Sequence, residues 1–81
     1  MEFQKRLGIE LNRIYAGTIV AKKDRLINSI YENSLPYTDF HVKSDNGRET
    51  NIEINFSHFV IEVKLLWDLT PNGFYRLNRI V

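Results

Sequence analysis

The sequence predicts one α+β domain in which one or two N-terminal helices pack on one face of a four-stranded antiparallel meander. Apolar residues recur at helical spacing in the first third of the chain and alternate with polar residues from residue 37 onward. Glycine-containing turns separate two pairs of the alternating segments. Because 81 residues suffice for one hydrophobic core and not for two, we expect a single domain over residues 1–81.

The first helix is predicted over about residues 2–16. Its apolar side chains share one side of the helical wheel: Phe3, Leu7, Leu11, Ile14 and Tyr15. Gly17 would form its C-terminal cap. Residues 14–21 leave alternatives open, because they also fit a strand, and a single helix could continue through Gly17.

A second helix is predicted over about residues 19–33. The side chains expected to face the core are Ile19, Leu26, Ile27, Ile30 and Tyr31. Leu35-Pro36 would end this helix, since a residue before proline disfavours the helical conformation.

The first two strands are predicted over about residues 37–43 and 49–56, where polar and apolar residues alternate. A three-residue loop, Asp45-Asn46-Gly47, would pair residue 40 with 52 and 42 with 50. This register puts the apolar residues on one face, whereas a two-residue loop would mix core and solvent residues.

The last two strands are predicted over about residues 59–69 and 74–81, although residues 59–67 also partly fit a helix. A Pro71-Asn72-Gly73 loop would pair Leu69 with Tyr75, Trp67 with Leu77 and Val63 with Val81 on the apolar core face, and would set Asp68 opposite Arg76. A tight Ser57-His58 turn would pair Phe56 with Phe59 and join the second strand to the third.

The composition excludes several classes of protein. The chain has no cysteine, so it has no disulfide framework, thiolate zinc site or thiol nucleophile. No apolar run could span a membrane, and the charged N-terminal residues do not resemble a signal peptide. We therefore expect a cytoplasmic protein without a membrane partner, and nothing in the sequence indicates a cofactor.

The charges are segregated along the chain. Residues 1–25 hold six basic and three acidic side chains, whereas residues 26–62 hold two basic and six acidic ones. One hypothesis is therefore a nucleic-acid-binding regulator whose candidate phosphate contacts are Lys5, Arg6, Arg13, Lys22, Lys23 and Arg25. The alternative interpretation is an ordinary solvated helix face, because the net charge of +1 is far below that of typical nucleic-acid binders.

The solvent face of the predicted sheet carries an acidic row. Asp39 would lie opposite Glu53, and Glu53 opposite Glu62, with His41 beside them. Opposed like charges repel, so the row could receive a basic partner or a metal ion. Solvated side chains splayed apart, with relief from nearby lysines, are the simpler interpretation.

The sequence predicts no catalytic centre. It has no nucleophile elbow, phosphate-binding glycine loop or ligand-spaced histidine motif. A minor hypothesis is a small RNA-cleaving, toxin-like hydrolase that would use His41 or His58 with a carboxylate.

The leading hypothesis is a non-enzymatic protein-interaction module, either a homodimer or an inhibitor or adaptor that binds another protein. Apolar residues are expected on the solvent face of the sheet as a candidate interface: Tyr37, Val60, Leu66, Phe74 and Ile80. The last strand would also be an unprotected sheet edge, which favours pairing with another chain.

Overall fold

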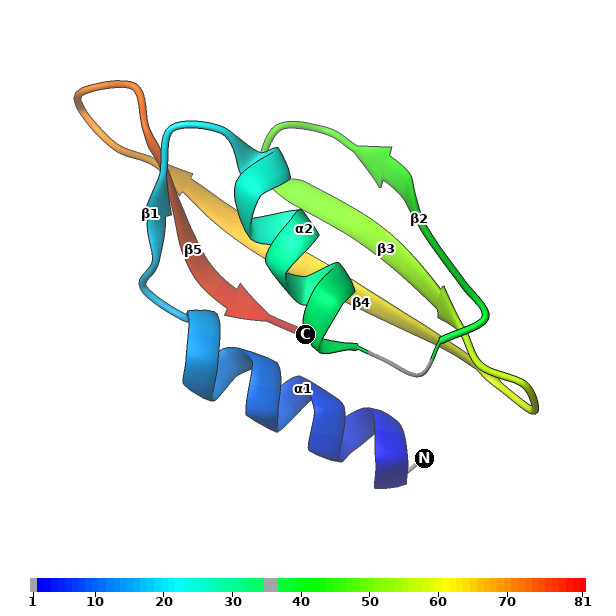
Figure 1. The fold of residues 1–81 in the computed structure, drawn as a ribbon. Helices are drawn as coiled ribbons and strands as arrows, with labels where there is room; N and C mark the ends of the chain where they lie inside the picture. Colours follow the sequence, from blue (N-terminus) through cyan, green and yellow to red (C-terminus); the bar gives the residue numbers. More distant parts are fainter. Residues whose placement is uncertain (1, 35–36) are drawn as a thin grey trace.

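The structure, a computed structural model, describes residues 2–34 and 37–81. In chain order the elements are α1 (Glu2–Tyr15), β1 (Ile19–Val20), α2 (Lys23–Asn33), β2 (Asp39–Asp45), β3 (Glu49–Asn55), β4 (Val60–Leu69) and β5 (Tyr75–Ile80). The strands form one antiparallel sheet in the order β1-β5-β4-β3-β2 (Figure 1). The α+β class and the antiparallel sheet are confirmed, but the prediction of four strands is wrong.

The additional strand, β1, lies where the second helix was expected to begin and within residues 14–21, for which a strand was the open alternative. Thr18, Ile19 and Val20 are all β-branched, which favours extended backbone. The chain here also bonds to the outer edge of β5, because Gly17 donates to the carbonyl of Leu77 and the Leu77 amide donates to Thr18. Helix α2 therefore begins at Lys23. The prediction that β5 is an unprotected edge is wrong, since β1 covers part of it.

One side chain of α1 covers more of the β5 edge. The side-chain amide of Asn12 donates to the Ile80 carbonyl at 2.6 Å. In return, the backbone N–H of Ile80 donates to the side-chain oxygen of Asn12 at 2.6 Å. These are the two bonds that a neighbouring strand would make. Helix α1 consequently runs beside the end of β5, as Figure 1 shows.

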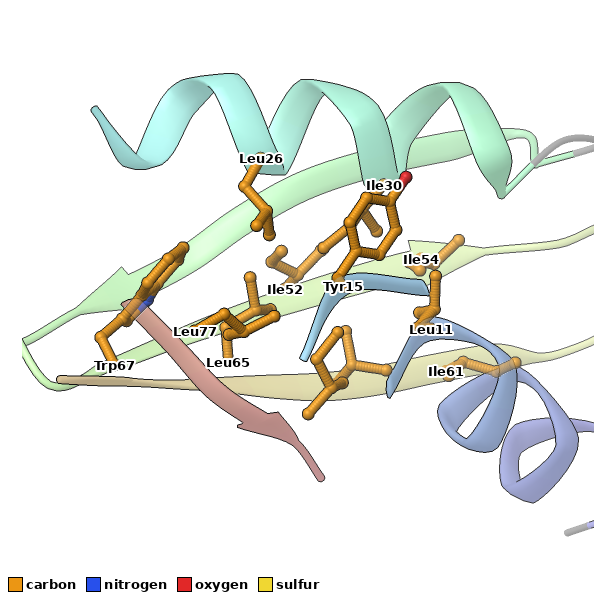
Figure 2. Packing of buried hydrophobic residues seen from close by; sticks show 12 residues of the cluster. Leu11, Tyr15, Leu26, Ile30, Ile52, Ile54, Ile61, Leu65, Trp67 and Leu77 are labelled. Atoms are coloured by element: carbon orange, nitrogen blue, oxygen red, sulfur yellow. The ribbon is translucent and has the colours of Figure 1, made fainter. Parts of the chain in front are cut away.

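Helix α2 lies across the sheet and contributes buried side chains to the core (Figure 2). Leu26 and Ile30 from α2 join Leu11 and Tyr15 from α1 in one cluster with strand residues. The strand members of this cluster are Ile52, Ile54, Ile61, Val63, Leu65, Trp67, Leu77 and Ile80. The predicted helix stop at Leu35-Pro36 and the side chain of Phe3 lie outside the described residues.

The register of the β2–β3 hairpin differs from the prediction. Phe40 pairs with Ile54 and Val42 with Ile52, two positions away from the expected partners. The chain reverses through Gly47-Arg48, with Asn46 bonded to Glu49, rather than through a three-residue loop. Gly47 has φ +94°, which favours glycine. Phe40 and Ile52 still share a face, because a shift of two residues preserves side-chain parity.

A β-bulge at Lys43 explains how this shorter loop is compatible with the apolar pattern. The register shifts by one residue between Val42 and Ser44, so the strand gains one residue relative to β3. Asp45 therefore pairs with the buried Thr50 on the core face. Without the bulge, Asp45 would share the solvent face with His41.

The other two hairpins agree more closely with the sequence. The β3–β4 pairing sets Glu53 opposite Glu62 and bonds the Phe56 amide to Phe59, as predicted. The β4–β5 loop also has the predicted bend, and Trp67 pairs with Leu77 and Asp68 with Arg76. Residues 60–69 form a strand, so the alternative of a helix over residues 59–67 is wrong.

A second bulge changes the end of β5. The register shifts between Leu66 and Trp67, with Asn78 as the extra residue on β5. Ile80 consequently pairs with Leu65 and is buried. The predicted pairing of Val63 with Val81 is wrong, because Val81 exchanges both backbone hydrogen bonds with Lys64.

Candidate functional site

The five predicted interface residues do not form one surface. Ile80 is buried in the core, so its assignment to an exposed patch is wrong. Tyr37 packs against Tyr31 and Phe40 beside the start of β2. Val60 begins β4, whereas Phe74 adjoins the β4–β5 loop at the other end of that strand. Leu66 is half-buried and lies between these two regions.

The structure places Phe74 instead in an apolar surface at the β4–β5 loop. We call Ile19, Leu69, Pro71 and Phe74 the hairpin-end surface. Ile19, Leu69 and Phe74 are 54%, 70% and 42% exposed. Together with Asp68, Thr70, Asn72 and Arg76 they line an open depression of about 640 Å³. In Figure 1 the loop projects beyond the body of the sheet, next to β1.

The charged groups of this depression are already paired. Arg76 donates to Asp68 at 2.8 Å, and the side-chain amide of Asn78 donates to the same carboxylate oxygen at 3.2 Å. Both Arg76 and Asp68 stay partly exposed. The depression therefore presents an apolar rim above a compensated ion pair.

A second, smaller hollow of about 120 Å³ lies along β1. Its lining residues come from α1, β1 and α2: Tyr15, Thr18, Val20, Arg25, Leu26 and Ser29. Ile19 lines the first hollow and its neighbours Thr18 and Val20 line the second. Since successive strand side chains point to opposite faces, the two hollows flank β1 on its two faces.

Among the predicted phosphate contacts, Lys23 has an internal role. Its ammonium donates to Asp45 at 3.0 and 3.2 Å and to the Gly47 carbonyl at 3.0 Å. It also lies 4.9 Å from the Tyr75 ring centroid and 5.7 Å from that of Trp67. These contacts hold Lys23 against the protein, so it is poorly placed to contact phosphate.

The polar contacts continue from Asp45 into the core. The Thr50 hydroxyl donates to Asp45 and accepts from the Trp67 indole, both at 2.9 Å. Burial opposes ionisation of Asp45, but hydrogen bonds from Gly47, Lys23 and Thr50 outweigh it and hold the pKa of this carboxyl below its ordinary value. The network joins α2 to the β2–β3 turn and β4.

The other basic residues lie on two helices and before the second one. Arg13 donates to Glu10 at 2.8 Å, and this bond lowers the pKa of the Glu10 carboxyl. Lys5 and Arg6 are exposed on α1, while Lys22 and Arg25 are exposed at the start of α2. Of the predicted phosphate contacts, Lys23 is therefore held by internal bonds and Arg13 is paired with Glu10.

The predicted acidic row is an alternating ionic row. His41, rather than Asp39, lies opposite Glu53, and its ring nitrogens are 3.4 Å from Asp39 and 3.2 Å from Glu53. Lys43 lies 2.8 Å from Glu62 and 3.9 Å from Glu53. Its hydrogen bond lowers the pKa of Glu62 and raises that of Lys43. Lys43, the extra residue of the bulge, thus provides a cation near both glutamates.

Residues 2–34 and 37–81 contain no cluster of three or more histidine, aspartate or glutamate side chains able to hold a metal ion. His58 is exposed in the β3–β4 turn, whereas His41 lies in β2 among carboxylates. In the same part of the chain, no helix is long and apolar enough to cross a membrane.

Sequence reasoning missed Ile19, Leu69 and Pro71 as surface residues. Ile19 was assigned to the core face of a helix, and Leu69 to the core face of a strand. Leu69 does pair with Tyr75, as predicted, yet it is exposed because it lies at the end of its strand. The β-branched run Thr18-Ile19-Val20 was the available signal for the strand at Ile19.

Comparison of the chain with protein-family models, with curated proteins and with solved structures gives no match. The function has to be inferred from the surfaces described above.

Proposed function

We propose that this protein is a small non-enzymatic protein-interaction module that binds its partner through the hairpin-end surface. The observation that supports the proposal is that Ile19, from β1, joins Leu69 and Phe74, from the β4–β5 hairpin, around one depression. Contiguous exposed apolar residues are typical of interaction sites.

The energetics favour a local anchor rather than a broad interface. Burying a large apolar side chain completely contributes about 1.5–3 kcal/mol. Leu69 is still 70% and Phe74 42% exposed, so a substantial part of that contribution remains available for binding. A partner that filled the depression would therefore gain affinity from a few central contacts, as hot spots do.

A partner other than a second copy is favoured by the sheet edges. Edge strand β2 carries a bulge and the charged residues Asp39, Lys43 and Asp45, which oppose edge-to-edge pairing. Edge strand β1 has two residues, so two copies of it could form only a very short ladder. Neither edge offers the long regular strand that a sheet-extended homodimer needs.

The test compares capture of proteins from a cell lysate by immobilised wild-type protein and by two variants. Leu69→Ser with Phe74→Ser removes the apolar rim, while Val60→Ser, at the opposite end of β4 and 51% exposed in the wild type, is the matched control. We expect a protein that the wild type and Val60→Ser capture equally and that the double variant loses at least tenfold.

Light scattering of the same samples reports self-association. A concentration-dependent dimer abolished by Leu69→Ser with Phe74→Ser would make the partner a second copy. A monomeric wild type that captures nothing, or equal capture by all three proteins, would refute the proposed function.

A further inference from the structure

The free edge of β1 is the feature that suggests how a partner binds. Among the described strands, β1 is hydrogen-bonded to β5 alone. Thr18 accepts from Leu77, and Ile19 lies opposite Arg76. In an antiparallel ladder bonded pairs alternate with non-bonded pairs, so the N–H and C=O of Ile19 point away from β5. They are available to an added strand.

Both faces beside this edge are hollowed. A strand laid along β1 would direct successive side chains to opposite faces of the sheet. One side chain would meet the depression lined by Ile19 and Phe74, and the next would meet the small hollow lined by Val20 and Arg25. Peptide binding by strand addition combines main-chain bonds at an edge with hollows for alternate side chains. Because β1 has only two residues, it offers the main-chain bonds of one residue, and the two hollows would supply most of the affinity.

The two hollows differ in chemistry. The larger one has an apolar rim, and its Asp68 and Arg76 already neutralise each other. The smaller one has room for a short side chain, and the exposed Arg25 is among its lining residues, with Lys22 also exposed nearby in the chain. Since β1 itself is uncharged, an acidic side chain would complement the second hollow without meeting a like charge in β1.

We propose that the protein binds an extended segment of another protein, added as a strand beside β1, in which a large apolar residue adjoins an acidic one. This inference rests on the proposed function. The apolar residue occupies the depression at the hairpin-end surface, and the acidic residue faces Arg25. The Ile19 backbone supplies the hydrogen bonds that align the segment.

The experiment selects binders from a displayed library of random linear peptides with the full-length protein as bait. We expect enrichment of extended sequences that contain an aromatic or large aliphatic residue next to aspartate or glutamate. Selection against Arg25→Glu should replace the acidic preference by a basic one.

Binding of a selected peptide is then measured with Ile19→Pro and Ile19→Val. Proline removes the N–H that points outward at residue 19, and this N–H makes no bond to β5. Valine keeps the N–H and has a similar side chain. We expect at least a tenfold loss of affinity for proline and less than a threefold loss for valine. Amide hydrogen exchange of wild-type Ile19 should slow when the peptide binds, which tests the same bond without any substitution.

The outcomes separate this inference from the proposed function. If Leu69→Ser with Phe74→Ser abolishes binding of the captured protein while Ile19→Pro does not, and Ile19 exchange is unchanged, strand addition is wrong and the interaction surface stands. Selected peptides with no apolar–acidic pair would also overturn the inference. If the hairpin-end variants bind as the wild type does, both proposals fail.

Discussion

Replacing Lys23 with methionine should destabilise the protein by about 2–3 kcal/mol. The change keeps an unbranched apolar side chain but removes the ammonium that bonds Asp45 and Gly47 and faces two aromatic rings. A hydrogen bond to a charged group contributes about 1.5–3 kcal/mol and a cation–π contact about 0.5–2 kcal/mol. We take the lower part of their sum, because Asp45 remains 34% exposed and can rehydrate.

The loss would be a large part of the total stability. A chain of this length has an unfolding free energy of about 4–12 kcal/mol, and each kcal/mol lost lowers the Tm by about 4–8 °C. Urea unfolding can be followed by fluorescence, since the chain has one tryptophan and Trp67 lies below the Lys23 ammonium. Lys22→Met, at the exposed neighbouring position, should change the unfolding free energy by less than about 0.5 kcal/mol.

A double-mutant cycle isolates the Lys23–Asp45 contact. Asp45→Asn keeps an oxygen that can accept from Gly47 and removes the charge that Lys23 faces. We expect the two substitutions to be non-additive by about 1–2 kcal/mol, as for residues in one network. Additive effects, or a Lys23→Met variant as stable as Lys22→Met, would refute the view that this network holds α2 to the β2–β3 turn.

Three further predictions follow from single residues. The pKa of Asp45 is lowered in the fold, so the stability that its ionised carboxyl contributes is complete above its unfolded pKa and is lost as pH falls through the folded pKa. In urea titrations, the difference in unfolding free energy between wild type and Asp45→Asn should be constant from about pH 7 to 5 and shrink below about pH 4. A difference that grows on acidification would contradict this sign. Asn12→Ala should destabilise by about 1–3 kcal/mol and speed hydrogen exchange at the Ile80 amide, whose partner it removes; unchanged exchange would show that Asn12 does not close the β5 edge. Gly47→Ala, at φ +94°, should lower thermal stability by about 1–2 kcal/mol, whereas Gly8→Ala inside α1 should raise it by about 0.5–1 kcal/mol because no atom crowds the added methyl group; the same sign for both would refute the backbone argument.

Local patterns were sufficient for much of the fold. Alternation identified β3 and β4, and the tight Ser57-His58 turn then determined their register. The pairing of Trp67 with Leu77 likewise followed from the Pro71-Asn72-Gly73 loop. In each case the register depends on a loop whose residues are adjacent in sequence, so the local chemistry carried enough information.

The errors arose where distant residues compete for the same backbone. Residues 19–20 join β5 because its outer edge offers hydrogen bonds to a β-branched segment more than fifty positions away. The bulges at Lys43 and Asn78 were equally hidden, since an inserted residue changes parity without a local marker. The relief of the acidic row by a nearby lysine was expected from the sequence, but only the structure identifies that lysine as Lys43, which lies 2.8 Å from Glu62 and 3.9 Å from Glu53.

The sequence by itself determined the α+β class, the placement of most strands and the absence of thiol chemistry, because these depend on side-chain periodicity and residue type. Only the tertiary structure decided that Lys23 serves the core network, that Ile80 is buried and that Ile19, Leu69 and Phe74 share a surface. Which groups end up together depends on long-range strand pairing and on the bulges within it, and neither is encoded in a local pattern.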